Sequence, residues 1–393
     1  MEFVSKINLT SSTNNKETFL DILNPKGAEI ILGETISSSF ISPVSPSPST
    51  MFGPRGACLI SEDGPLWVCD TGHHRLLGWK YRPEKDNQAA DWVIGQPDFY
   101  HEGQNAKSNV QANTLNVPTG ICHFEEGLIV ADAWNHRVLI WHKMPSNNNA
   151  KADIVLGQNN FNENESNQGN LTTAANKMHW PYGVMYFQGR LFVADTGNRR
   201  ILVWNKLPTK NGQPADYVLG QSNMNLRDEN GGKDPNSSSL RWPHALTIWN
   251  NNLVVTDAGN NRIMIWDGIP TNSNTPCSFV LGQNNFRDTE LNKGNYFPSS
   301  NSLSMPYGIA VIDKWLISAD TANSRLIGWN NKPVIGQLAK GLTGQSDFKI
   351  KNENRFYGKS SRDSLNWPYG ITTCKNTAVI SDSGNNRILL WRL

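Results

Sequence analysis

The stretch DTGHHRLLGW at residues 70–79 combines a carboxylate, two histidines and an arginine, and it is one copy of an internal repeat. The other copies are DAWNHRVLIW at 132–141, DTGNRRILVW at 195–204, DAGNNRIMIW at 257–266, DTANSRLIGW at 320–329 and DSGNNRILLW at 382–391. Their leading aspartates are spaced by 62 or 63 residues along the chain. Self-similarity at a fixed period is the signature of a repeat architecture, so we expect six copies of one structural unit.

Each unit contains two further signatures. Upstream of the aspartate lies a Pro-x-Gly segment, as in WPYGV at 180–184, followed by an apolar run that ends in the aspartate. Downstream of the tryptophan lies a segment such as DWVIGQPDF at 91–99. The apolar runs are short and bounded by Gly, Asn, Asp or Pro, which is typical of strands and turns. Four strands per unit, repeated radially, predict an all-β fold: a six-bladed β-propeller of four-stranded antiparallel blades.

The last unit lacks its fourth strand, because only RILLWRL follows its turn. The segment AEIILGETISSSF at 28–40 resembles the missing part, with Glu34 in place of glutamine. We therefore expect this N-terminal strand to complete the sixth blade and close the ring without an open edge. Residues 28–393 then form the propeller. Residues 1–27 form an arm that is either disordered or a short helix, and its removal up to residue 25 is expected to matter little.

The Pro-x-Gly segment, the VAD end of the second strand and the D-[TAS]-x-N-x-R turn together resemble NHL repeats over residues 28–393. The resemblance implies a propeller, because five of the six turns match the pattern in full and the turn at 70–75 differs only in having His73 in place of the asparagine. It does not select a function. NHL propellers include RNA-binding domains, protein-interaction platforms and a zinc-dependent peptide-amidating lyase, and one fold hosts many functions.

Composition narrows the functional classes. With Lys+Arg 36 and Asp+Glu 34, the formal charge is +2, which disfavours a dedicated nucleic-acid binder. No apolar run is long enough for a transmembrane helix and no secretory signal is visible, so we expect no membrane association. Five scattered cysteines fit reduced thiols better than a disulfide framework, which predicts a cytoplasmic protein.

The repeated turn residues are interpreted as scaffold. A catalytic site needs different groups that converge on one point, whereas a residue repeated around a ring serves each blade. The aspartate can accept backbone N–H groups, and the arginine five residues later can return to it as a charge-assisted pair. The tryptophan is expected to anchor blade packing, and the Gly-Gln pair to form a bulge and a bond to a neighbouring strand. His73 and His74 stay unexplained by this scheme.

Long connections rich in Asn, Ser and Gly lead into the innermost strands at residues 99–116, 161–179, 224–241, 286–304 and 348–366. We expect them to build up one face, here called the long-loop face, where binding sites are common. The alternative is that these connections are solvent-exposed loops without a binding role. The candidate binding residues in the rim turns of this face are His73, His74, Trp134, His136 and Arg199.

The variable residue of each Pro-x-Gly segment, including the variants GPRGA at 53–57 and WPHAL at 242–246, is expected at the mouth of a central channel. Around the ring these residues are Arg55, Thr119, Tyr182, His244, Tyr307 and Tyr369. Convergent polar and aromatic groups at a concave mouth are a ligand-site hypothesis. The alternative is that the tyrosines cap the packing between blades.

Metal binding is not favoured, and we expect no cofactor. A zinc site built from His73, His74 and His136 is one hypothesis, since these residues lie in equivalent turns of adjacent blades. The weak candidates for a soft metal, at one position of three consecutive blades, are Cys58, Cys122 and Met185. Small apolar side chains are also what a narrow innermost strand requires, which is the structural interpretation of the same residues.

The leading functional hypothesis is a non-catalytic binding or assembly platform that recognises a protein or peptide through the long-loop face. The alternative is a propeller enzyme of the lyase or hydrolase type, with or without a metal, which acts at the channel mouth through His244, Arg55 and the tyrosines. A small molecule is a further candidate ligand. RNA binding is disfavoured, because its electrostatic contribution requires a basic excess.

Overall fold

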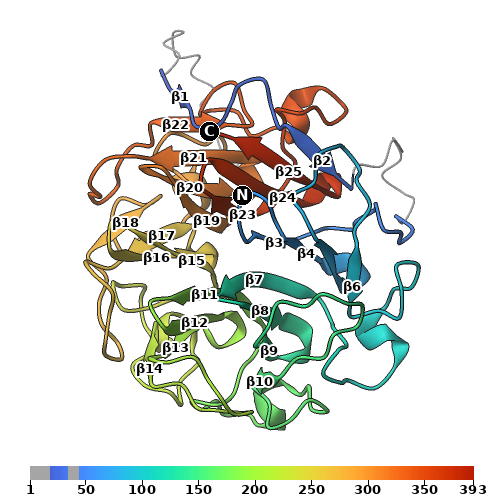
Figure 1. Cartoon of the computed structure of the whole chain (residues 1–393). Coiled ribbons are helices and arrows are strands. Elements are labelled where there is room, and N and C mark those ends of the chain that lie inside the picture. The colour runs from blue at the N-terminus through green and yellow to red at the C-terminus, as the bar shows by residue number, and fades with distance from the viewer. Residues whose placement is uncertain (1–17, 34–43) are drawn as a thin grey trace, which may run out of the picture.

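The structure is a computed structural model that describes residues 18–33 and 44–393. Within these residues the strands form six sheets arranged around a central axis (Figure 1). Each sheet corresponds to one repeat unit, and we number the blades 1 to 6 in the order of the turn aspartates, from Asp70 to Asp382. The predicted six-bladed propeller is confirmed, with neighbouring strands antiparallel inside each repeat unit.

The innermost strand begins at the proline of the Pro-x-Gly segment in blades 2 to 6, and at its glycine in blade 1. From the axis outwards, the strands of blades 1 to 3 are β3 (Gly56–Leu59), β4 (Leu66–Asp70), β5 (Arg75–Trp79) and β6 (Trp92–Ile94); β7 (Pro118–Phe124), β8 (Gly127–Asp132), β9 (Arg137–Trp141) and β10 (Ile154–Leu156); and β11 (Pro181–Phe187), β12 (Arg190–Asp195), β13 (Arg200–Trp204) and β14 (Tyr217–Leu219). Those of blades 4 to 6 are β15 (Pro243–Trp249), β16 (Asn252–Asp257), β17 (Arg262–Ile265) and β18 (Phe279–Leu281); β19 (Pro306–Ile312), β20 (Trp315–Asp320), β21 (Arg325–Trp329) and β22 (Gly341–Thr343); and β23 (Pro368–Cys374), β24 (Thr377–Asp382), β25 (Arg387–Arg392) and β2 (Ile30–Leu32).

Short 3-10 helices form the turns and the long connections. Those that follow the turn aspartates are η1 (Thr71–His73), η3 (Ala133–Asn135), η5 (Thr196–Asn198), η7 (Ala258–Asn260), η9 (Thr321–Asn323) and η11 (Ser383–Asn385). Those in the long connections are η2 (Gln104–Lys107), η4 (Ser166–Gly169), η6 (Glu229–Gly232), η8 (Leu291–Gly294) and η10 (Glu353–Phe356).

The hydrophobic core consists of layers between adjacent blades. One layer brings together Ile129 and Val138 of blade 2 with Leu202 of blade 3. The turn tryptophans lie in these layers, as predicted: Trp204 is 1% exposed, and its indole N–H donates to the carbonyl of Gln213 at 3.1 Å. The tryptophans therefore serve as packing anchors whose only polar atom is satisfied.

The N-terminal segment closes the ring. β2 pairs antiparallel with β25, with Ile31 opposite Leu389, so the outermost strand of blade 6 comes from the opposite end of the chain. The indole N–H of Trp391 donates to the carbonyl of Asn24 at 2.8 Å, a contact that the connection after the third strand supplies in the other blades. The predicted closure is confirmed for residues 28–33, while Glu34 lies outside the described residues.

The described part of the expected arm packs more tightly than the sequence suggested. Leu20–Asp21 forms β1, which lies parallel to β22 at the outer edge of blade 5, so this part is a strand and not a helix. Ile22 and Leu23 are 1% and 2% exposed, and they pack in the layer between blades 5 and 6. Residues 18–27 therefore contribute to the core of the ring. Residues 1–17 lie outside the described part.

In the described ranges, no helix has the length and apolar character needed to cross a membrane.

Candidate functional site

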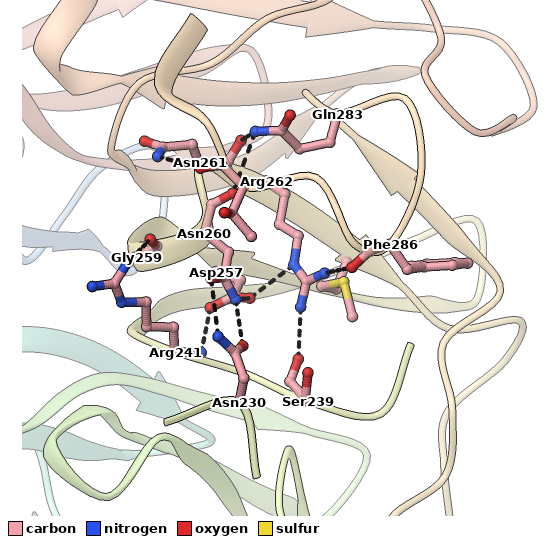
Figure 2. A network of polar contacts seen from close by, with 12 residues as sticks. Asn230, Ser239, Arg241, Asp257, Gly259, Asn260, Asn261, Arg262, Gln283 and Phe286 are labelled. Carbon is pink, nitrogen blue, oxygen red and sulfur yellow. Dashed lines mark hydrogen bonds and ion pairs between the residues drawn. The ribbon is translucent and has the colours of Figure 1, made fainter. Parts of the chain in front are cut away.

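The turn aspartate and arginine form a buried ion pair in each blade. In blade 4, Arg262 Nε and Asn260 Nδ2 both donate to Asp257 Oδ2, at 2.9 and 2.7 Å, while Oδ1 accepts the N–H of Arg241 at 2.8 Å (Figure 2). The corresponding Arg–Asp distances around the ring are 2.7–2.9 Å, with both side chains fully buried. Both carboxylate oxygens are occupied by structural partners, which confirms the scaffold interpretation.

The same buried network holds the base of each long connection. Arg262 Nη1 and Nη2 donate to the carbonyls of Phe286 and Ser239, which belong to the connections on either side of blade 4 (Figure 2). Gln283 Nε2 donates to the carbonyls of Asn261 and Glu290, which belong to the turn and to the next connection. The predicted bond of this glutamine to a neighbouring strand is therefore wrong. Turns and long connections therefore share one face, whose loops are anchored at their bases.

In five of the six blades, the residue four positions after the turn aspartate links its blade to the next. In blade 4, Asn261 Oδ1 accepts the N–H of Met305 in blade 5 at 2.8 Å. His74 and His136 occupy this position in blades 1 and 2, and each uses Nδ1 as the acceptor at 3.1 Å. The donors, in the following blade, are the backbone N–H groups of Val117 and Trp180. We call this contact the inter-blade latch.

An imidazole can serve as a latch only when its acceptor nitrogen is unprotonated. Burial lowers the pKa of His74, and burial together with neighbouring His179 lowers the pKa of His136 to about 4. Both rings are therefore neutral at pH 7. Arg199 occupies the same position in blade 3 but offers no acceptor, and the N–H of Trp242 bonds Asp257 Oδ1 at 3.2 Å instead.

His73 replaces the asparagine that follows three positions after the aspartate in the other blades. Its Nδ1 lies 2.8 Å from Asp70 Oδ2, and its Nε2 lies 2.6 Å from the carbonyl oxygen of Val44. Burial alone would lower the pKa of His73, but the bond to Asp70, the charge of Asp70 and the bond to Val44 outweigh burial and raise it. Both partners can only accept, so the ring carries two protons. His73 is fully buried and is not accessible on the rim.

The channel mouth is built by a bulge in the innermost strands. In blade 3 the pairing of β11 with β12 shifts between Pro181 and Gly183, which leaves Tyr182 unpaired and turns its side chain to the axis. Gly183 has no room for a side chain, because a Cβ atom would lie 2.1 Å from the carbonyl oxygen of His244 in the next blade. The shift recurs in blades 2, 4, 5 and 6. The Pro-x-Gly pattern thus places each variable side chain at the axis.

Four aromatic rings lie against one another in sequence around the mouth. The ring centroid of His244 lies 4.8 Å from that of Tyr182 and 4.2 Å from that of Tyr307. Tyr307 in turn lies 4.3 Å from Tyr369, nearly parallel to it. Residues from blades 3 to 6 therefore form one continuous aromatic wall. These four variable side chains converge at the channel mouth, as predicted.

Arg55 of blade 1 completes the circle. Its guanidinium carbon lies 4.4 Å from the centre of the Tyr369 ring, and its Nη1 donates to the hydroxyl oxygen of Tyr182 at 3.3 Å. The Arg55 side chain thus reaches from blade 1 to both ends of the aromatic wall. Thr119 of blade 2 is buried beside it and donates its hydroxyl to the Tyr182 carbonyl at 2.9 Å.

A cavity of about 440 Å³ lies along the channel, and all six variable side chains line it. Below the mouth its wall is formed by the innermost strands, with apolar residues such as Val184 and Ile371 and the threonines Thr247 and Thr372. This volume is in the range of pockets that hold small organic ligands, and the combination of an apolar wall with few polar groups is typical of such pockets.

The mouth carries one formal positive charge, that of Arg55. Burial lowers the pKa of His244 to about 4, with the Arg55 cation acting in the same direction and the hydrogen bond to the Trp242 carbonyl acting against it. Nδ1 of His244 lies 3.0 Å from the carbonyl oxygen of Trp242. Because a carbonyl oxygen can only accept a hydrogen bond, Nδ1 carries the ring proton. Burial also raises the pKa of Tyr307 and of Tyr369. The imidazole and these two phenols are therefore uncharged at pH 7.

The sulfur side chains of the innermost strands belong to different parts of the core. Cys58, Cys122 and Met185 pack in three different layers between blades. Burial raises the pKa of Cys58 to about 12 and also raises that of Cys122, which disfavours the thiolate that a soft metal requires. In the described part of the chain, no three His, Cys, Asp or Glu side chains are grouped closely enough to hold a metal ion.

Exposed aromatic side chains surround the mouth on the long-loop face. We call them the rim aromatics, and they are Phe52, Trp134, Trp180, Trp242 and Trp367, each 39–50% exposed. Trp180 and Trp367 directly precede a Pro-x-Gly segment and have left-handed backbones with φ near 50°, which aims their N–H groups at the latch of the preceding blade. Of these residues, only Trp134 was predicted from the sequence, although the WP pairs at 180–181, 242–243 and 367–368 are a visible signal for the other three tryptophans.

Further exposed aromatics lie on the tips of two adjacent connections. Tyr296 and Phe297 are 73% and 57% exposed in the connection into blade 5. Phe356 and Tyr357 are 78% and 60% exposed in the connection into blade 6. The ammonium of Lys351 lies 3.8 Å from the centre of the Tyr296 ring and joins the two connections. The aromatic surface thus extends from the mouth towards blades 5 and 6.

Comparison with known proteins supports the fold. No protein-family model matches the chain, and no curated protein matches its sequence. A structural-genomics protein of unknown function from Bacteroides thetaiotaomicron is similar in structure, with a TM-score of 0.52 and 10% identity over 92% of this chain and 75% of that chain. Virginiamycin B lyase from Staphylococcus aureus has a TM-score of 0.43 and 12% identity over 92% of this chain and 98% of that chain. At 10% identity the likeness to the Bacteroides protein concerns the fold alone.

Proposed function

We propose that this propeller is a non-catalytic binding or assembly platform of the NHL-repeat type, which recognises a protein or peptide through the long-loop face. The observation that carries the proposal is the cluster of rim aromatics around one end of the channel. Single exposed apolar residues are ordinary on protein surfaces, whereas several on one face mark interaction sites. Trp, Tyr and Arg are also the residues that dominate binding energy at protein interfaces.

The anchoring of the loops favours the same function. Each connection is held at its base by the buried arginine and asparagine of a turn, as Arg262 and Asn260 hold those around blade 4. A partner that binds the face therefore orders little of the protein backbone, which lowers the entropic cost of association. The rim residues Trp134 and Arg199 belong to this proposed surface, whereas His74 and His136 support it from below as latches.

Photo-crosslinking tests the proposal. A p-benzoylphenylalanine at position 242 should crosslink the partner in cells, and the same group at Tyr81, which is 64% exposed beyond the third strand of blade 1, should not. With the partner identified, Trp242→Ala should weaken its binding by about 2 kcal/mol, roughly 30-fold in Kd. The matched control Tyr81→Ala should leave Kd unchanged. Equal crosslinking at both positions, with no effect of Trp242→Ala, would contradict the proposal.

A propeller enzyme acting at the channel mouth is the second candidate. It is favoured by His244, whose Nδ1 is bonded to the carbonyl of Trp242, which leaves Nε2 as the unprotonated ring nitrogen. Such a nitrogen can accept a proton or orient a ligand. His244→Phe keeps an aromatic ring in the stack and removes this nitrogen. Loss of a turnover with unchanged partner affinity would support the enzyme, and unchanged turnover would contradict a role of His244 in catalysis.

A further inference from the structure

Arg55 differs from the arginines of the turns in how its charge is satisfied. Arg262 and its counterparts each contact an aspartate at 2.7–2.9 Å and donate to backbone carbonyls as well. The Arg55 guanidinium has no carboxylate within ion-pair distance among the described residues, and its one hydrogen bond to them is the 3.3 Å contact with Tyr182. Most of its five N–H donors are therefore available to a ligand.

The surroundings of Arg55 increase its attraction for an anion. The guanidinium rests on the face of Tyr369 at 4.4 Å and lies 5.9 Å from the centre of the Tyr182 ring. These rings and the neutral His244 exclude water from one side of the charge without neutralising it. An electrostatic interaction is stronger beside such apolar groups than in bulk water.

The same wall offers flat surfaces for the body of a ligand. Tyr182, His244, Tyr307 and Tyr369 present consecutive rings, and aromatic rings prefer to stack on or against other planar groups. The cavity of about 440 Å³ next to them is larger than a one-ring organic acid requires. Its size and chemistry thus fit a molecule with a charged end and a flat or apolar body.

We propose that the channel mouth binds a small organic carboxylate, with the carboxylate paired to Arg55 and the body of the ligand against the aromatic wall. A guanidinium matches the two oxygens of a carboxylate in a bidentate geometry, which a lysine ammonium does not. This ligand site goes beyond the proposed platform, because it lies at the axis and uses Arg55, whereas the partner surface uses the rim aromatics.

Benzoate is the probe for the test, with benzamide as a neutral molecule of the same shape and acetate as an anion without a body. Saturation-transfer NMR on the full chain should detect benzoate with a Kd on the order of 1 mM, as expected for so small a ligand. Benzamide and acetate should each bind at least about tenfold more weakly, since each lacks one of the two contacts. Equal binding of benzoate and benzamide, or no benzoate signal at about 10 mM, would overturn the proposal.

Variants locate the site. Arg55→Met should weaken benzoate binding about tenfold, and Arg55→Lys should give an intermediate Kd because it keeps the charge and loses the planar fork. Tyr307→Leu should weaken benzoate but not acetate, since it removes only a stacking surface. The control Lys206→Met removes an exposed cation beyond the third strand of blade 3 and should leave Kd unchanged. Benzoate binding that survives Arg55→Met, in a variant with the wild-type melting temperature, would place the ligand elsewhere.

Discussion

The turn networks and the channel mouth are both rings of six equivalent positions, yet they are organised in opposite ways. The turns repeat the same aspartate and arginine in every blade and satisfy them internally. The mouth places six positions at one point and fills them with an arginine, a threonine, a histidine and tyrosines. Repetition therefore marks groups that serve one blade each, whereas variation at a shared point marks groups that act together.

The exceptions inside the turns follow the same logic. In the sequence, His74 and His136 resemble catalytic or metal-binding residues. In the structure they accept the same inter-blade hydrogen bond that Asn261 and Asn386 accept in blades 4 and 6. A side chain that deviates from the repeat can thus perform the repeated function with another atom. Deviation at separated positions is weaker evidence for a site than deviation at positions that converge.

Loss of a turn carboxylate is predicted to have the largest effect on stability. Asp257→Ala leaves Arg262 buried without its counter-ion, which costs about 3–5 kcal/mol. Thermal unfolding followed by circular dichroism should show a clear fall in Tm. The control Asp267→Ala removes an exposed carboxylate in the same blade and should change Tm little. Similar melting temperatures for both variants would remove the distinction between scaffold and surface.

The N-terminal segment gives the next largest effect. Ile22→Ala opens a cavity between blades 5 and 6, where Ile22 is 1% exposed, at a cost of about 2–5 kcal/mol. Leu20→Ala, at a position 56% exposed, should cost much less. Unfolding in guanidinium chloride measures both. If the two variants were equally stable, residues 18–27 would be dispensable, as the sequence alone suggested.

The rim aromatics should affect binding and not stability. Trp180→Ala combined with Trp367→Ala removes two side chains that are 43% and 39% exposed, so Tm should change little. Partner affinity should fall by about 2 kcal/mol or more. Titration calorimetry with the partner that the crosslinking experiment identifies measures this affinity. A large fall in Tm with unchanged affinity would assign these residues to the scaffold.

The latch histidines are expected to have a smaller effect on stability, and this effect depends on pH. The folded-state pKa of His136 is about 4, below its value of about 6.5 in the unfolded chain. Between these values the unfolded state binds more protons, so stability is full above pH 6.5 and falls as the pH drops towards 4. His136→Asn keeps an acceptor that does not titrate, and the loss of Tm between pH 7.5 and 4.5 should be smaller than in wild type.

The control for this effect is His142→Asn, because His142 is exposed and lies outside the latches. Its acid loss of Tm should match that of wild type. His74 and His244 also have lowered pKa values, so part of the pH dependence should persist in His136→Asn. If Tm fell as much between pH 7.5 and 4.5 in His136→Asn as in wild type, protonation of the His136 latch would not contribute to the pH dependence of stability.

The sequence predicted the blades, the ring closure and the scaffold role of the turns, because six copies of one unit can be compared with each other. It could not predict the packing of Ile22 and Leu23, since this segment has no counterpart in the repeat. The latch was hidden because an amide oxygen, a hydroxyl oxygen and an imidazole nitrogen accept the same hydrogen bond. These atoms belong to residues that look unrelated in a sequence.

The channel mouth was predicted in part. The Pro-x-Gly spacing identified the six variable positions, since the bulge recurs with the pattern. The order of stacking and the span of Arg55 from blade 1 to Tyr182 of blade 3 depend on distances across the axis, which no local pattern encodes. The exposure of Trp180 and Trp367 depends on left-handed backbones set by the latch of the preceding blade.

Two arginine variants give the most direct comparison of the turn networks with the channel mouth. Arg262→Met should lower Tm by several degrees, because it leaves Asp257 buried and uncompensated at a cost of about 3–5 kcal/mol. Arg55→Met should melt within about 1 °C of wild type, since it breaks one long hydrogen bond at a partly exposed position. Equal losses of Tm in the two variants would contradict the account, because Arg55 would then be scaffold as much as Arg262.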